Sequence, residues 1–139
     1  MYEKLRTADP DRISSKVLAY IGDSVFELYS RLYVLNKYDD KMSGLHKYNI
    51  AMVNAGAQAG FARRIQGILT EKETAVFKRG RNSSTGTMSK NSNAVDYRVA
   101  TGLESLIGYL YLAHEDQRLE EILGIIFDEL KIDRCRSTK

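Results

Sequence analysis

Residues that break helices or cross-link chains are scarce in this sequence. Pro10 is the only proline in 139 residues, so no proline interrupts a helix after that position. Cys135 is the only cysteine, which excludes a disulfide within the chain and fits a reducing compartment. These absences exclude a disulfide-stapled scaffold and leave long, uninterrupted helices open to the chain.

Long hydrophobic segments are absent as well. The longest apolar run, from Leu106 to Ala113, has eight residues, whereas a membrane-spanning helix needs about 20. The stretch from Met1 to Arg12 is charged and lacks the apolar segment of a signal peptide. We therefore predict a cytoplasmic protein that does not enter a membrane.

The chain has the size and composition of one soluble domain. Hydrophobic residues make up 43% and charged residues 28% of the sequence, which is enough apolar material for one core. Apolar residues recur at helical spacing, and no strand-like alternation appears. We predict a single all-α domain over residues 1–139, with its core over about 14–131 and a flexible tail over 133–139.

The first half of the chain predicts two long helices. Ser14 or Ser15 can cap a helix that runs to about Asn36. A polar connection over 38–44 leads to a second, alanine-rich helix over about 45–68. The apolar residues of the first helix follow a spacing of three and four: Leu18, Ile21, Val25, Leu28, Leu32 and Leu35.

The second half predicts three more helices. Thr70 and Glu73 match a capping box, which indicates a short helix that ends near Arg79. The elements expected after it are an irregular segment over 80–93, a long helix over about 94–113, and a last helix from a cap at Asp116 to about Lys131.

Charge is unevenly distributed along the chain. The net charge is only +3, but residues 61–90 hold seven cations and two anions. Residues 115–129 hold six acids and one arginine. A basic middle and an acidic end are consistent with a nucleic-acid surface, and equally with an uneven solvated surface.

The most basic segment is also the least regular. Residues 78–90 carry four cations and no acid, among glycines, hydroxyls and amides that suit close contact with phosphates. No aromatic residue is present, which argues against base stacking on single strands. We expect a basic RNA-binding loop over about 78–93 along a duplex groove, with a flexible linker as the alternative. The residues expected to bind RNA are Lys78, Arg79, Arg81, Asn82, Ser83, Thr85 and Lys90.

Two apolar helical stretches each carry one carboxylate. Asp23 lies in the stretch over 18–25, and Glu104 lies in the stretch over 103–109. A carboxylate among apolar neighbours is costly unless something pairs with it. If the two helices cross, both acids can bind one Mg²⁺, which prefers hard oxygen ligands. The alternative for Asp23 is an ordinary surface position on the polar edge of its helix.

Both stretches also contain a glycine, and one contains a second acid. Gly22 and Gly108 each cost about 1 kcal/mol relative to alanine within a helix. Either the backbone must approach something there, or the two helices cross tightly. Glu27 can pair with Arg31 one turn later, which favours a structural ion pair over a metal ligand.

These motifs resemble a known family. The stretch from Leu18 to Leu28 is similar to the signature helix of ribonuclease III nuclease domains. The stretch from Leu103 to Leu112 is similar to the second acidic helix of the same domains. The resemblance covers about residues 14–131. The run from Tyr97 to Gly102 is similar to the Mini-ribonuclease III group, and 139 residues leave no room for a double-stranded-RNA-binding domain.

The resemblance implies a homodimeric, Mg²⁺-dependent endoribonuclease, with Mn²⁺ as a substitute metal. It would cut double-stranded RNA and leave 5′-phosphate and 3′-hydroxyl ends. Asp23 and Glu104 would be both the catalytic residues and the metal ligands. The Mini-ribonuclease III group further implies precursor 23S ribosomal RNA as substrate in a bacterial cytoplasm. A patch around Tyr29 and Tyr33 is one hypothesis for the dimer contact, with burial in the core as the alternative.

The sequence departs from the family at two acidic positions. Full-length ribonuclease III enzymes carry acids at the positions of Ala19 and Thr101, so half of the usual carboxylates are absent. Water or RNA oxygens would have to complete the site, and the number of metal ions stays open. The loss keeps a non-catalytic structured-RNA-binding protein of the same fold as an alternative function.

Two further points remain open at this stage. A helical protein-interaction domain would explain the apolar pattern but not the basic segment. RNA binding with a steep salt dependence would distinguish the nuclease and the RNA-binding protein from such a domain. His46 and Lys47, at the start of the second predicted helix, could reach RNA. The alternative for both is an inert surface position.

Overall fold

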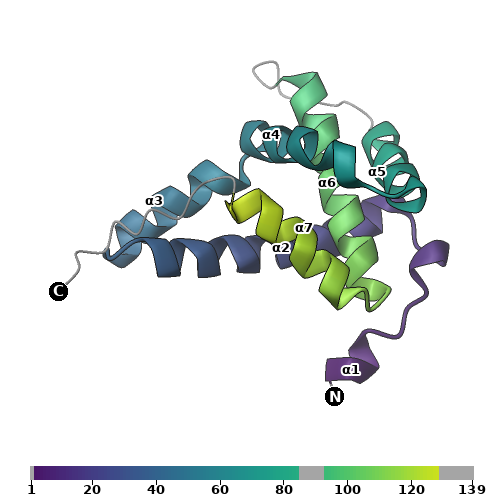
Figure 1. The fold of residues 1–139 in the computed structure, drawn as a ribbon, viewed down its shortest axis with the longest axis horizontal. Helices are drawn as coiled ribbons and strands as arrows, with labels where there is room; N and C mark the ends of the chain where they lie inside the picture. The colour runs from purple at the N-terminus through teal and green to yellow at the C-terminus, as the bar shows by residue number, and fades with distance from the viewer. Residues whose placement is uncertain (1, 85–92, 129–139) are drawn as a thin grey trace.

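The computed structural model describes residues 2–84 and 93–128, and these contain helices and no strand. The all-α prediction is therefore confirmed. The elements in chain order are α1 (Tyr2–Leu5), η1 (Pro10–Arg12), α2 (Ser15–Lys37), α3 (Met42–Val53), α4 (Ala55–Ile65), η2 (Gln66–Ile68), α5 (Glu71–Ser83), α6 (Ala94–Leu112) and α7 (Asp116–Asp128). In Figure 1, α6 runs through the middle of the molecule and the other long helices surround it.

Local capping explains where several helices begin. The Ser14 hydroxyl accepts a hydrogen bond from the amide of Val17 at 3.3 Å and caps α2. At α5, Thr70 Oγ1 accepts from the Glu73 amide at 3.1 Å, and Glu73 Oε1 accepts from the Thr70 amide at 2.9 Å. The predicted capping box is thus confirmed. Asn93 caps α6 in the same way.

The single helix predicted over 45–68 is wrong, because Asn54 divides it into α3 and α4. Asn54 has an extended backbone, with φ −70° and ψ 160°. Its Oδ1 accepts from the amide of Ala57 at 2.9 Å, and its Nδ2 donates to the carbonyl of Ala51 at 3.1 Å. One side chain therefore ends a helix and begins the next. In addition, α3 begins at Met42, before the predicted start.

Helix α5 extends to Ser83, so its predicted end near Arg79 is wrong. Gly80 lies inside the helix because α5 packs closely on α6 there. A Cβ atom at Gly80 would lie 2.6 Å from Cβ of Ser105 and 3.1 Å from Cα of Gly102. This glycine thus permits helix contact and does not end the helix. Residues 85–92 of the predicted basic loop lie outside the described residues.

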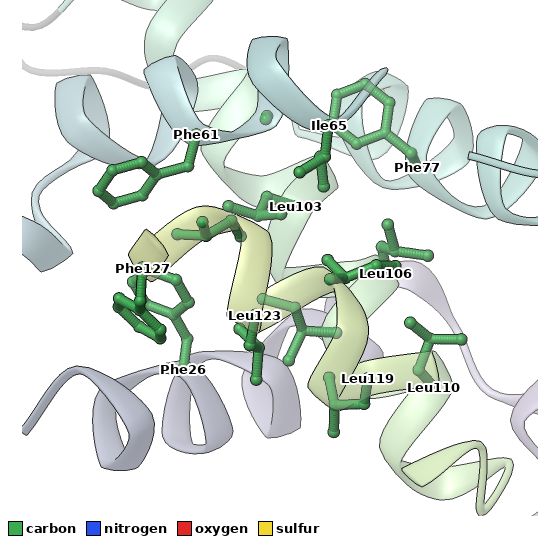
Figure 2. Packing of buried hydrophobic residues seen from close by; sticks show 14 of the residues in the cluster. Phe26, Phe61, Ile65, Phe77, Leu103, Leu106, Leu110, Leu119, Leu123 and Phe127 are labelled. Carbon is green, nitrogen blue, oxygen red and sulfur yellow. The ribbon is translucent and has the colours of Figure 1, made fainter. Parts of the chain in front are cut away.

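The core forms where α2, α4, α5 and α7 meet around α6. Figure 2 shows Leu103, Leu106 and Leu110 of α6 among side chains of the surrounding helices. On α7, Phe127 stacks against Phe26 of α2 with ring centroids 5.9 Å apart. Burial of such large apolar side chains contributes about 1.5–3 kcal/mol each and holds α6 in place.

Helix α2 turns a different face to the core than its strongest apolar stripe predicts. Leu28, Leu32 and Leu35 are 57%, 45% and 52% exposed. The buried residues of α2 are Leu18, Ala19, Gly22, Phe26, Ser30, Tyr33 and Val34. The reason is that α2 meets α6 through its small residues, which rotates the leucine stripe outward.

For Tyr33 the core alternative holds, whereas a dimer contact of Tyr29 stays a prediction. Tyr33 is buried and stacks on Phe127 with centroids 5.1 Å apart. Tyr29 is half-buried and packs against the same core.

The N-terminal segment contacts the region where α6 ends and α7 begins. The buried guanidinium of Arg6 pairs with the carboxylate of Asp116 at 2.7 Å and lies over the ring of Tyr111 at 4.0 Å. Asp116 is the first residue of α7 and engages Arg6. The predicted end of this helix near Lys131 lies outside the described residues. In the part of the chain that the structure describes, no helix is both long and apolar enough to cross a membrane.

Candidate active site

Helices α2 and α6 cross with their backbones in contact at two glycines. A Cβ atom on Gly22 would overlap the carbonyl oxygen of Glu104 and lie 2.8 Å from the nitrogen of Gly108. A Cβ atom on Gly108 would overlap the carbonyl oxygen of Leu18. No side chain fits between the two helices at these positions, so both glycines are needed for the tight crossing.

The crossing places Asp23 beside Glu104. Asp23 follows Gly22 on α2 and is exposed, whereas Glu104 is half-buried on α6. Burial first, and then the negative charge and hydrogen bonding of Asp23, raise the pKa of Glu104 to about 8. The two carboxylates are therefore close enough to interact, and burial together with Asp23 disfavours the ionised form of Glu104.

A glutamine that was not predicted from the sequence also contacts Glu104. Gln58 of α4 is 2% exposed. Its Nε2 donates to the carbonyl oxygen of Val53 at 2.8 Å and to Oε2 of Glu104 at 3.4 Å. This hydrogen bond favours the ionised form of Glu104 and opposes the rise of its pKa. The sequence signal was an amide with an alanine on each side in an otherwise apolar helical stretch.

Glu27 takes part in a structural network, as its spacing from Arg31 predicted. Its Oε2 accepts a hydrogen bond from Nε of Arg31 at 3.2 Å. The same oxygen accepts from Nδ2 of Asn49, whose Oδ1 accepts from the buried hydroxyl of Ser30 at 2.6 Å. Sequence spacing alone could not identify Asn49, because its partners lie on the neighbouring helix α2. This network joins α2 to α3 and occupies the Glu27 carboxylate.

The two positions that lack acids carry no other metal-binding group. Ala19 is buried beneath α6, and the hydroxyl of Thr101 donates to the carbonyl oxygen of Tyr97 at 3.0 Å. Among residues 2–84 and 93–128, no three or more His, Cys, Asp or Glu side chains are grouped so that they could hold a metal ion together. The candidate centre therefore consists of the Asp23 and Glu104 carboxylates with the Gln58 amide behind them.

Comparison with known proteins identifies the family and supports the fold. The model of the ribonuclease III domain matches residues 16–115, a range that includes both helices of the crossing. The chain belongs to the ribonuclease III family. Members of this family are endoribonucleases, and so is this chain.

Individual relatives narrow the family membership to the Mini-ribonuclease III group. The chain is 47% identical over 127 residues to Mini-ribonuclease 3 of Clostridium tetani, covering 91% of this chain and 84% of that protein. It is 40% identical over 118 residues to Mini-ribonuclease 3 of Enterococcus faecalis, covering 84% and 89%. A crystal structure of a Fusobacterium nucleatum protein matches with a TM-score of 0.76 at 30% identity, covering 85% of this chain and 94% of that one.

In this ribonuclease III family member, the predicted RNA-binding residues that the structure describes lie at the end of α5. Lys78, Arg79 and Asn82 are exposed, while Arg81 and Ser83 are half-exposed. Two of these side chains make only local contacts: Arg81 Nε donates to Asn82 Oδ1 at 3.3 Å, and the Ser83 hydroxyl donates to a carbonyl of the same helix at 2.9 Å. Thr85 and Lys90 lie outside the described residues.

The end of α5 borders the segment of α6 that carries the acid. Gly80 packs against Ser105, the residue after Glu104. Arg79 is exposed and Arg81 half-exposed on either side of this contact between α5 and α6. His46 and Lys47 are exposed on α3, and their contact with RNA stays a prediction.

Proposed function

We propose that this chain is a Mg²⁺-dependent endoribonuclease that cuts double-stranded RNA as a homodimer in the cytoplasm. Asp23 and Glu104 are its catalytic residues and metal ligands. The observation that carries the proposal is the adjacency of these two carboxylates at the crossing of α2 and α6, where the pKa of Glu104 is raised to about 8.

The donor set suits a hard divalent cation. Two carboxylates side by side repel each other, and a cation between them removes that repulsion. Mg²⁺ commonly binds through one or two carboxylates, with water and substrate phosphate completing its shell, so the absence of acids at Ala19 and Thr101 is compatible with it. Mn²⁺ fits the same oxygen ligands. When bound, the ion supplies an activated water and neutralises charge on the phosphodiester, which gives 5′-phosphate and 3′-hydroxyl ends.

Residues of the chain bind the cation, hold the two helices together and orient the duplex. Asp23 and Glu104 hold the cation, and Glu104 loses its proton to do so. Gly22 and Gly108 keep the two helices close enough for both acids to act together. The cations Lys78, Arg79 and Arg81, together with the predicted contacts of Thr85 and Lys90, orient the duplex by contacting its phosphates.

The test of this function is cleavage of a labelled RNA duplex in Mg²⁺, with EDTA and the corresponding single strand as controls. We expect cleavage of the duplex only, and only with metal. A transcript carrying the paired ends of 23S ribosomal RNA precursor tests the proposed natural substrate, which the family resemblance supports. Tight duplex binding without cleavage of any of these RNAs would contradict the proposal.

Metal affinity should depend on pH through Glu104. Because its pKa of about 8 lies above the ordinary value of 4.5, Glu104 must lose a proton when metal binds. We expect the Mg²⁺ affinity to rise about tenfold per pH unit from pH 6 to 8 and to level off above that. The same raised pKa lowers the stability of the metal-free protein as pH rises from 4.5 to 8. Calorimetric Mg²⁺ titrations over this range check the slope, and an affinity independent of pH would contradict it.

Binding of the duplex should depend on the basic end of α5. Replacing Arg79 and Arg81 with alanine removes two cations, so the slope of log affinity against log salt should become shallower by about 2. Duplex affinity measured at several salt concentrations in Ca²⁺ or EDTA tests this expectation. The matched control replaces Lys4 of α1 and Lys41 at the start of α3, which are both exposed. Figure 1 shows α1 and α3 apart from α5. Equal losses in both double variants would contradict a specific role for α5.

The exposed leucine stripe of α2 supports the homodimer. Leu28, Leu32 and Leu35 form one apolar face, and it continues into a cavity of about 340 Å³ that Leu35 and Met42 help to line. Such a continuous exposed patch is typical of a surface that another protein covers. A second copy of the chain fits the proposal, because a duplex has two strands to cut and each subunit carries one acidic pair.

Disrupting this stripe should separate the subunits. Leu32→Glu places a charge in the middle of the apolar face, and we expect it to convert a dimer into a monomer at micromolar concentration. Size-exclusion chromatography with light scattering gives the mass directly. Ile68→Glu is the matched control, because Ile68 is a similarly exposed apolar residue at 42% on η2. A monomeric parent, or a dimeric Leu32 variant, would contradict this interface.

A further inference from the structure

Gln58 is a buried amide of which one half is unpaired. Gln58 is 2% exposed, and among residues 2–84 and 93–128 its Oε1 has no hydrogen-bond partner. A buried polar atom without a partner costs about 1–3 kcal/mol. An apolar side chain of the same length would fill the site without that cost. Stability alone therefore does not explain an amide at this position.

The other half of the amide is held in place from the helix junction. Val53 is the last residue of α3, where carbonyl oxygens lack partners within the helix. Its carbonyl accepts from Nε2 of Gln58 at 2.8 Å. Because Asn54 bonds both helices at this junction, the anchor point of Gln58 is rigid.

From this anchor the amide reaches the acidic pair. The same Nε2 lies 3.4 Å from Oε2 of Glu104, across the contact between α4 and α6. Within the described residues, the side chains that interact with the Glu104 carboxylate are Asp23 and Gln58, and only Gln58 is a neutral donor. Asp23 repels an ionised Glu104, whereas the Gln58 amide attracts it.

We propose that Gln58 is a positioning residue, which fixes the Glu104 carboxylate beside Asp23 so that both acids can bind one divalent cation. This inference rests on the proposed function and adds a residue from a third helix to the site. The unpaired Oε1 is then the cost of placing an amide donor against a metal ligand. Partners of this kind, bonded to a metal ligand, typically change metal affinity about 10- to 100-fold when removed.

The test is Mn²⁺ binding to the protein without RNA, measured by the electron paramagnetic resonance signal of free Mn²⁺. Gln58→Met keeps the length and apolar stem of the side chain but removes the donor. We expect it to weaken Mn²⁺ binding about tenfold, while the melting temperature stays equal or rises. Gln58→Leu serves as a second variant in case Met packs poorly.

The matched control is Ser105→Ala on the same helix as Glu104. Ser105 is buried and donates to the carbonyl oxygen of Ser15 at 2.9 Å. We expect its loss to lower the melting temperature and to leave Mn²⁺ affinity unchanged. The positioning role is overturned if both Gln58 variants bind Mn²⁺ like the parent. It is also overturned if, in both variants, the loss of Mn²⁺ affinity is proportional to a loss of stability.

Asp23→Asn in the same titration separates this inference from the proposed function. Weaker Mn²⁺ binding by the Asp23 variant, with unchanged binding by both Gln58 variants, would overturn the role of Gln58 alone. Unchanged binding by the Asp23 variant would overturn the two-carboxylate metal site itself, and the role of Gln58 with it.

Discussion

Asp23→Asn and Glu104→Gln are each expected to lower duplex cleavage by about 1,000-fold or more while the protein stays folded. Each change keeps the size of the side chain and removes one of the two charges that we propose hold the metal. Loss of a single preorganised electrostatic contact already costs about 100- to 1,000-fold in enzymes. The rate should be measured in single turnover with saturating protein, so that weaker RNA binding does not mask the effect.

Stability distinguishes this result from unfolding. Asp23 is exposed, and when both acids are ionised it repels Glu104, so its neutral variant should melt at the same temperature as the metal-free parent or higher. Glu120→Gln is the control, because Glu120 is an exposed acid on α7 and should keep full activity. Cleavage at the parent rate by either site variant, or unfolding of the Asp23 variant, would contradict the site assignment.

Gly22→Ala is expected to destabilise the fold by about 3 kcal/mol or more, at the upper end of what overpacking costs. Its Cβ atom would lie 2.7 Å from the carbonyl carbon of Glu104, and a backbone carbonyl cannot rotate away as a side chain can. The helices must therefore separate. For a chain of this size, the melting temperature should fall by roughly 10 °C. Separation of the helices also moves Asp23 from Glu104, so cleavage should be lost even below the melting temperature.

Two other helical glycines provide matched controls. At Gly60 in α4 and Gly124 in α7, an added Cβ would meet no described atom within 4 Å beyond the adjacent backbone of its own helix. Alanine at either position should leave stability unchanged or raise it by up to about 1 kcal/mol, because alanine favours the helix. If Gly22→Ala behaves like these controls, the crossing is not as tight as the structure places it. Thermal unfolding of all three variants decides the point.

Much of the local structure follows from short-range signals in the sequence. Ser14 and the pair Thr70 and Glu73 are close to the amides they cap, so their role can be predicted from spacing alone. Asn54 carried a similar signal, since asparagine before an alanine-rich stretch is a common helix start. The continuous apolar spacing around it hid that signal, and one helix was predicted where two exist.

The sequence by itself determined the all-α class and singled out the candidate pair Asp23 and Glu104 with the two glycines near them, because each lies within a local helical motif. Tertiary structure alone decided which face of α2 is buried, since Gly22 must meet α6 and this turns the leucine stripe to the surface. It also decided the role of Gln58, whose partner Glu104 lies 46 positions away and is reached only through packing of α4 on α6. Contacts between helices that are distant in sequence depend on which faces pack together, and short-range residue spacing does not predict those faces.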